Sequence, residues 1–128
     1  RASRGARVIE RLCGAMRPAP AWGRYAERLS ERLSLDDKQK ALLKDWQEAR
    51  IKARDETRAA MCSPKPDLAT FAGRLDYRQK RLEIQLATFK ATRPKLEAFY
   101  NALSDQQKAS WDEVRARRDE RRHRRRRD

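Results

Sequence analysis

The chain has 128 residues, a length typical of one domain, and carries a formal net charge of +14. Charged residues make up 41% of it, glycine occurs only four times, and most residues are good helix formers, which favours an all-α protein with a thin core. The longest uncharged run, residues 98–104, falls far short of the roughly 20 apolar residues that span a bilayer, which excludes a transmembrane helix.

Most of the excess positive charge lies at the two ends. Residues 115–128 contain nine arginines and three acidic residues, and residues 1–24 contain six arginines and one acidic residue. We therefore divide the chain into a basic N-terminal lead-in (1–12), a helical domain (13–114) and the Arg-rich C-terminal tail. Because the chain begins with Arg instead of Met, we expect a processed form from which a signal peptide has been removed.

The tail is either a solvated segment or a site that binds polyanions. The polyanion-binding candidates are Arg121, Arg122, Arg124, Arg125, Arg126 and Arg127. No apolar spacing continues beyond Arg115, so nothing in the sequence indicates that this segment packs on the helical domain.

Two helices are predicted in the first half of the chain. Apolar residues at helical spacing predict a short helix over residues 22–33. Asp36 is a good N-cap, and Gln39 stands three residues later, which together form a capping box that opens a helix over about residues 37–61. Two prolines within residues 64–66 then end that helix and turn the chain.

A long amphipathic helix is predicted over residues 67–103. Its large apolar residues recur every three or four positions once Arg78 and Arg93 fill the gaps, which is the spacing of a seam that lies against another helix. They are Leu68, Phe71, Leu75, Leu82, Leu86, Phe89, Leu96, Tyr100 and Leu103. We expect Asp67 to cap this helix, and Pro94 to kink it or to restart it after Arg93.

Cys13 and Cys62 are the only cysteines. They are either two buried free thiols or a disulfide. A metal site is disfavoured because the sole histidine, His123, lies in the tail, and the body has no histidine base to activate a thiol nucleophile. We expect the disulfide, because a crosslink greatly stabilises a thin domain, and disulfides persist in oxidising compartments outside the cytoplasm.

Two segments have the same form, Leu35-Asp36-Asp37-Lys38-Gln39 and Leu103-Ser104-Asp105-Gln106-Gln107, and in the second Ser104 can cap a last helix with Gln107 three residues later. They resemble the paired Leu-Thr-x-x-Gln motifs of the LTXXQ family, the Spy/CpxP-like periplasmic proteins, with Asp36 and Ser104 in place of the threonines. Cys13-Gly14, Cys62-Ser63-Pro64 and residues 93–100 resemble a disulfide-bearing branch of that family. The resemblance covers about residues 12–114.

The resemblance implies a thin, bent helical hairpin of about four helices, often paired into a cradle-like homodimer. It also implies an ATP-independent periplasmic chaperone, a holdase, which binds unfolded or partly folded client proteins. Some relatives instead regulate envelope sensor proteins, and others bind metals through His-rich or acidic sites. The single tail histidine disfavours a metal site here, and we expect no cofactor.

The residues themselves do not indicate an enzyme or a small-molecule substrate, since there is no glycine-rich phosphate loop and no Ser/His/Asp set. Client binding needs a surface that mixes apolar groups with cations. The candidates are Arg50, Ile51, Arg54, Arg74, Tyr77, Lys80, Arg81 and Ile84. For Tyr77 and Ile84, packing against the helix over 22–33 or against a dimer partner is an equal alternative.

Two other functions stay open at the level of sequence. One is a regulatory or structural partner of an envelope protein, and the other is a polyanion or nucleic-acid binder that acts through the tail. Nucleic acid is disfavoured, because the body has no recognised nucleic-acid-binding fold and a disulfide argues against a cytoplasmic role.

Overall fold

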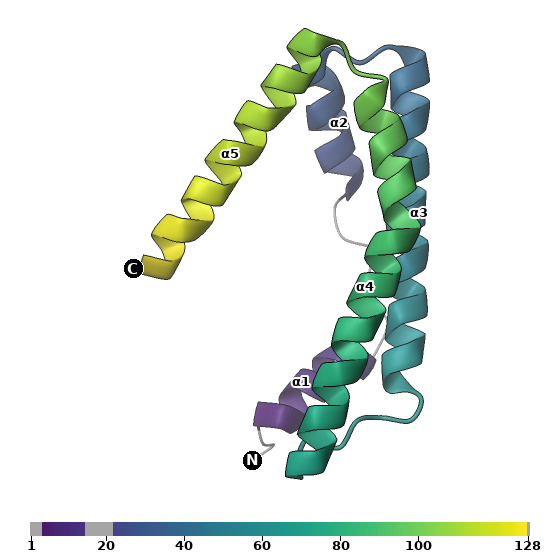
Figure 1. Cartoon of the computed structure of the whole chain (residues 1–128), viewed down its shortest axis with the longest axis vertical. Coiled ribbons are helices and arrows are strands. Elements are labelled where there is room, and N and C mark those ends of the chain that lie inside the picture. The colour runs from purple at the N-terminus through teal and green to yellow at the C-terminus, as the bar shows by residue number, and fades with distance from the viewer. Residues whose placement is uncertain (1–3, 15–21, 128) are drawn as a thin grey trace.

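The computed structural model describes residues 4–14 and 22–127. These residues form five α-helices and no strand, which confirms the all-α prediction (Figure 1). The helices are α1 (Arg4–Cys13), α2 (Trp22–Leu33), α3 (Asp37–Cys62), α4 (Phe71–Asn101) and α5 (Asp105–Arg127). The bounds of α2 are those predicted, and α3 ends one residue later than predicted.

The two longest helices, α3 and α4, lie side by side and form an antiparallel hairpin (Figure 1). α1 lies at the end of the hairpin where α3 turns into α4, and α2 lies at the opposite end. α5 starts at that second end and diverges from the hairpin, while α2 contacts both α3 and α5. The molecule is therefore a thin, bent helical hairpin with an open angle between α4 and α5.

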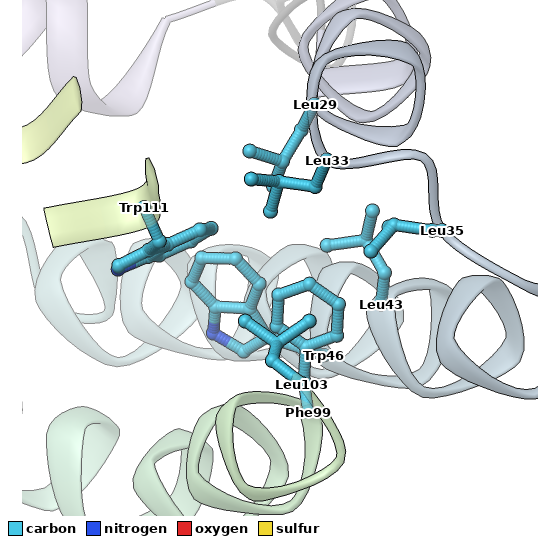
Figure 2. Close-up of a cluster of buried hydrophobic side chains, with 8 residues drawn as sticks. All are labelled: Leu29, Leu33, Leu35, Leu43, Trp46, Phe99, Leu103 and Trp111. Carbon is cyan, nitrogen blue, oxygen red and sulfur yellow. The ribbon is translucent and has the colours of Figure 1, made fainter. Parts of the chain in front are cut away.

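The hydrophobic core lies where α2, α3, α4 and α5 meet (Figure 2). Its buried residues are Leu29, Leu33, Leu35, Leu43, Trp46, Phe99, Leu103 and Trp111. The rings of Trp46 and Phe99 stack with their centroids 6.5 Å apart, and the ring of Trp111 is inclined to both, at 6.3 and 5.7 Å. Because Phe99 has no exposed surface, these three rings hold α3, α4 and α5 together at one end of the hairpin.

The start of α4 differs from the prediction. Its N-cap is Thr70, whose Oγ1 accepts a hydrogen bond from the backbone N–H of Gly73 at 3.0 Å. Asp67 instead accepts a hydrogen bond from the backbone N–H of Ala69 at 2.9 Å, within the preceding loop. The prediction that Asp67 caps the long helix is therefore wrong, because a short turn stabilised by its carboxylate separates it from the helix.

Pro94 lies in the interior of α4, and the helix does not restart after Arg93. Proline removes the backbone donor to the carbonyl group four residues earlier, here that of Lys90. Both Pro94 and Lys90 are exposed, so solvent can bond to that carbonyl group and the helix continues to Asn101.

The N-terminal lead-in forms a helix, α1, which the sequence analysis did not predict. Cys13 at its end is bonded to Cys62 at the end of α3, with the two Cα atoms 5.6 Å apart, which confirms the expected disulfide. The guanidinium group of Arg58 in α3 also donates a hydrogen bond to the carbonyl oxygen of Gly14. α1 is thus fastened to the end of the hairpin that lies far from the core.

Candidate functional site

Five large apolar side chains are exposed along one face of α4. They are Phe71, Leu75, Leu82, Leu86 and Phe89, and each is between 51 and 69% exposed. At about 1.5 Å per residue they extend over roughly 27 Å of the helix. We call this set the α4 stripe.

The α4 stripe is most of the seam predicted from the sequence. At its C-terminal end that prediction is right, since Leu96 and Tyr100 pack against the core and Leu103 is buried in it. From Phe71 to Phe89 it is wrong for the single chain, because α3 packs against a different face of α4. The apolar face that sequence spacing detects is real, but no helix among the described residues covers it.

Thr88 identifies the face of α4 that meets α3. Its Oγ1 lies 3.1 Å from the Oγ1 of Thr57, and the two hydroxyl groups share a hydrogen bond across the hairpin. Ile84 and Tyr77 precede Thr88 by four and eleven residues, which places all three on one side of the helix, and both are half-buried. Tyr77 and Ile84 therefore lie on the side of α4 that faces α3, a neighbour that neither the client-binding prediction nor its packing alternative named.

The remaining client-binding candidates do not form one patch. Arg74 and Arg81 are exposed on α4, whereas Arg50, Ile51, Arg54 and Lys80 are half-buried. The guanidinium group of Arg74 donates to the carbonyl oxygens of Leu68 and Ala69, at 3.3 and 3.4 Å, at the first turn of α4. Arg50, by contrast, lines a cleft near the core, so the predicted set is spread along the hairpin.

The two five-residue segments open α3 and α5 in the same way. The backbone N–H of Gln39 donates to Asp36 Oδ1 at 2.8 Å, and the backbone N–H of Asp36 donates to Gln39 Oε1 at 3.0 Å. The backbone N–H of Gln107 donates to Ser104 Oγ at 3.1 Å, and that of Ser104 donates to Gln107 Oε1 at 2.8 Å. Both segments are reciprocal capping boxes, and the leucine that begins each, Leu35 or Leu103, is buried in the core.

The two motif glutamines also bond to each other. Gln39 Nε2 donates to Gln107 Oε1 at 2.9 Å, and Gln107 Nε2 donates to Gln39 Oε1 at 3.2 Å. Each Nε2 has a second acceptor, which is the carbonyl oxygen of Ala102 for Gln39 and that of Leu33 for Gln107, at 2.8 and 2.9 Å. The motif residues therefore serve the fold, since they fix the starts of α3 and α5 against each other.

A cleft of about 670 Å³ lies between α2, α4 and α5, with two residues of α3 also lining it. Seven arginines line it: Arg28, Arg32, Arg50, Arg93, Arg115, Arg118 and Arg122. No acidic residue is among the described residues that line it. Tyr25, Trp46 and Phe89 add aromatic surface, so the α4 stripe ends at this arginine cleft.

The guanidinium groups of the arginine cleft lie close to one another and to aromatic rings. Burial, and then the charges of Arg115 and Arg118, lower the pKa of Arg50 from its usual range, although Tyr25 opposes the shift. The guanidinium carbon of Arg50 lies 4.9 Å from the ring centroid of Trp46, and that of Arg118 lies 5.7 Å from the ring centroid of Tyr25. Arg50 and Arg118 are thus held against aromatic rings inside the cleft.

Comparison of the chain with models of known protein families agrees with the presence of the two capping motifs. A model described as LTXXQ motif family protein matches residues 23–115, more than two thirds of the chain. The chain belongs to the LTXXQ motif family. No curated protein and no solved structure matches it. The family match extends from α2 to the first half of α5 and includes both motifs.

The Arg-rich tail of this LTXXQ protein continues α5 as a helix to Arg127. All six polyanion-binding candidates predicted there are exposed. Arg122 lines the arginine cleft, and Arg124 lies 3.9 Å from the carboxylate of Glu120 in an exposed ion pair. The tail is therefore partly joined to the folded body, through residues that sequence spacing did not connect with it.

Sequence reasoning missed the arginine cleft, although it named two of its members, Arg50 and Arg122. Two signals pointed to it. Arg28 and Arg32 are four residues apart on α2, and Arg115, Arg118 and Arg122 recur at three and four residues on α5, so each set occupies one face of its helix. The sequence could not show that these two faces turn toward the same space.

Within residues 4–14 and 22–127, no group of three or more His, Cys, Asp or Glu side chains could hold a metal ion. In the same ranges, no helix combines the length and apolar character that crossing a membrane requires.

Proposed function

We propose that this LTXXQ protein is an ATP-independent periplasmic chaperone that holds unfolded or partly folded proteins on the α4 stripe. The observation that carries this proposal is the exposure of five large apolar side chains on one helix face. Monomeric proteins rarely expose a contiguous apolar surface of this kind unless it binds something. The oxidised Cys13–Cys62 pair supports a compartment outside the cytoplasm.

The charges beside the α4 stripe suit clients of varied sequence. Arg78 and Arg93 lie on the same face of α4 as the apolar residues, since they fall at the helical spacing between Leu75 and Leu82 and after Phe89. Arg78 is exposed, and Arg93 forms an exposed ion pair with Glu97. Cations attract acidic unfolded chains over a distance, and the apolar side chains retain them after contact without a fixed geometry.

Light scattering from a reduced, aggregating model client tests the proposal, at physiological salt and without ATP. We expect the protein to suppress aggregation near stoichiometric amounts. About tenfold more of the double variant Leu82→Glu/Leu86→Glu than of the parent protein should be needed for the same suppression, because two carboxylates interrupt the apolar surface. Its helix content should not change, because both side chains are more than half exposed.

The matched control is Ala87→Glu/Ala91→Glu. It adds the same two charges at the same spacing on exposed positions of α4 that lie away from the stripe. It should suppress aggregation as well as the parent protein does. Equal loss in both variants, or no suppression by the parent protein, contradicts the chaperone proposal.

A second copy of the chain is the competing occupant of the α4 stripe, as the cradle-like dimer of the resemblance implies. Sedimentation distinguishes the two. If the parent protein is a dimer and Leu82→Glu/Leu86→Glu is a monomer, the stripe is a dimer interface and clients bind elsewhere. If both have the same mass, the stripe is free for clients.

A further inference from the structure

We propose that the arginine cleft is a binding site for a ligand with several closely spaced phosphate groups. This inference goes beyond the chaperone proposal, because the arginine cleft and the α4 stripe are different surfaces that meet at Phe89. The shared ligand chemistry is a cluster of phosphates, which a free oligophosphate or a lipid surface can supply.

Positive charge is concentrated in the arginine cleft. Seven guanidinium groups from four helices line one cleft of about 670 Å³, and no acidic residue lines it among those the structure describes. Arg93 is paired with Glu97, but Arg28, Arg32 and Arg118 have no ion pair with an acidic residue in the described part of the chain. Like charges this close repel one another, and a bound polyanion removes that repulsion.

The chemistry of the guanidinium groups favours phosphate over other anions. A guanidinium group presents a planar fork of N–H donors that matches two oxygens of one phosphate. Stacking on Tyr25 holds Arg118 by the face of its guanidinium group, which leaves the N–H groups at its edge for a ligand. A phosphate monoester carries about 1.5 to 2 negative charges, so two or three neighbouring phosphates supply about 3 to 6, whereas the same number of carboxylates supplies about 2 or 3.

Part of the lining of the arginine cleft is apolar. Leu29, Leu96 and Val114 lie in the same cleft as the guanidinium groups. Apolar walls keep water away from part of the site and strengthen the attraction between the arginines and an anion. Trp46 also lines the cleft, so a ligand bound there should change the tryptophan fluorescence of the chain.

The test is a titration of the full chain with sodium tripolyphosphate at about physiological salt, followed by tryptophan fluorescence and by calorimetry. The cleft variant is Arg28→Gln/Arg32→Gln/Arg118→Gln, and the control is Arg121→Gln/Arg125→Gln/Arg126→Gln, which removes the same charge outside the cleft. We expect about a tenfold loss of affinity in the cleft variant and less than about a twofold loss in the control. Equal losses in both variants, or no saturable binding by the parent chain, overturn the proposal.

Two further arms identify the ligand. The variant Arg28→Lys/Arg32→Lys/Arg118→Lys keeps the positive charge but loses the planar guanidinium donors. It should therefore bind tripolyphosphate several-fold more weakly than the parent chain. Polyglutamate that binds as tightly as tripolyphosphate overturns the preference for phosphate. Vesicles of phosphatidylglycerol and phosphatidylcholine test for a lipid ligand. If the parent chain binds them, the cleft variant does not, and tripolyphosphate displaces them, the phosphates come from lipid. If the parent chain binds tripolyphosphate but not the vesicles, the ligand is a free oligophosphate.

The same variants separate this inference from the chaperone proposal. Leu82→Glu/Leu86→Glu lies outside the arginine cleft and should bind tripolyphosphate with unchanged affinity. If that variant loses aggregation suppression and keeps tripolyphosphate binding, the two sites are independent. Loss of tripolyphosphate binding in this correctly folded variant contradicts the placement of the ligand in the arginine cleft.

Discussion

The side-chain amides of Gln39 and Gln107 bond to each other at 2.9 and 3.2 Å although the residues are 68 positions apart in the sequence. Each amide also caps its own helix and bonds to a carbonyl group one or two residues before the other motif's segment. All donors and acceptors of the pair are satisfied, and the pair is linked to two helix starts at once. This relationship explains why one protein carries the same motif twice.

The variant Gln39→Ala should lower the free energy of unfolding by about 2 to 4 kcal/mol, because the side chain takes part in four hydrogen bonds and its loss leaves partly buried partners unsatisfied. Urea unfolding followed by circular dichroism measures this change. Gln106→Ala is the control, since Gln106 is an exposed residue of the second motif for which no side-chain hydrogen bond is found, and it should change stability by less than about 0.5 kcal/mol. Equal effects of the two substitutions would show that the amide pair does not contribute.

Reduction of the Cys13–Cys62 disulfide should release α1 before the hairpin unfolds. The bond closes a loop with a sequence separation of 49, for which the chain-entropy model gives about 4 kcal/mol. Arg4, Arg7 and Arg11 are exposed on α1, so trypsin should cut there rapidly in the reduced protein and slowly in the oxidised one.

The double variant Cys13→Ser/Cys62→Ser checks this prediction without a reductant. Its trypsin pattern should match that of the reduced protein, whereas the fluorescence of the aromatic core at the other end of the hairpin should not change. Simultaneous loss of core fluorescence and of α1 would mean that the two ends of the hairpin unfold together.

Tyr100 should ionise above the usual pH range of tyrosine. Partial burial and the carboxylate of Asp112, to which its hydroxyl donates at 3.3 Å, raise the pKa of Tyr100. Because the raised pKa belongs to the folded state, the interaction stabilises the fold below about pH 10 and is lost as the pH rises through the raised value.

Tyrosinate absorbance is titrated with pH in the parent protein and in Tyr100→Phe, and the difference between the two titrations gives this pKa. In Asp112→Asn the same difference titration should move to lower pH, since the neighbouring negative charge is gone. Asp45→Asn, an exposed substitution on α3, should leave the titration unchanged. No movement in Asp112→Asn would contradict the assignment of the shift to this neighbour.

Two glycine substitutions should have opposite effects on stability. A Cβ atom at Gly73 would lie 1.9 Å from the carbonyl oxygen of Asp67, so Gly73→Ala must displace the loop before α4 and should cost more than about 1 kcal/mol. A Cβ atom at Gly23 meets nothing within 4 Å, so Gly23→Ala should stabilise α2 by about 0.5 to 1 kcal/mol. Thermal unfolding of both variants measures the two effects, and a stabilised Gly73→Ala variant would contradict the close approach of the loop.

Local chemistry made the starts of α3 and α5 and the crosslink predictable. Asp36 and Ser104 could be read as caps because a cap acts on residues two or three positions away, and only two cysteines were available to pair. Helical periodicity also located the apolar face of α4, but it could not say which face α3 covers, because the hydrogen bond across the hairpin joins the hydroxyl groups of Thr57 and Thr88, which a search for apolar residues does not detect. The arginine cleft depends on how far α5 diverges from α4, which no local pattern encodes.

The hairpin is closed separately at its two ends. The glutamine pair and the aromatic core close one end, and the Cys13–Cys62 bond and the Thr70 cap lie at the other. Between them α3 and α4 touch through side chains such as Thr57 and Thr88. Neither closure depends on the number of helical turns that separate them. Insertion of two turns, about seven residues, into both helices would therefore lengthen the α4 stripe by about 10 Å and leave both closures intact, so that the length of this apolar surface can change while the fold stays the same.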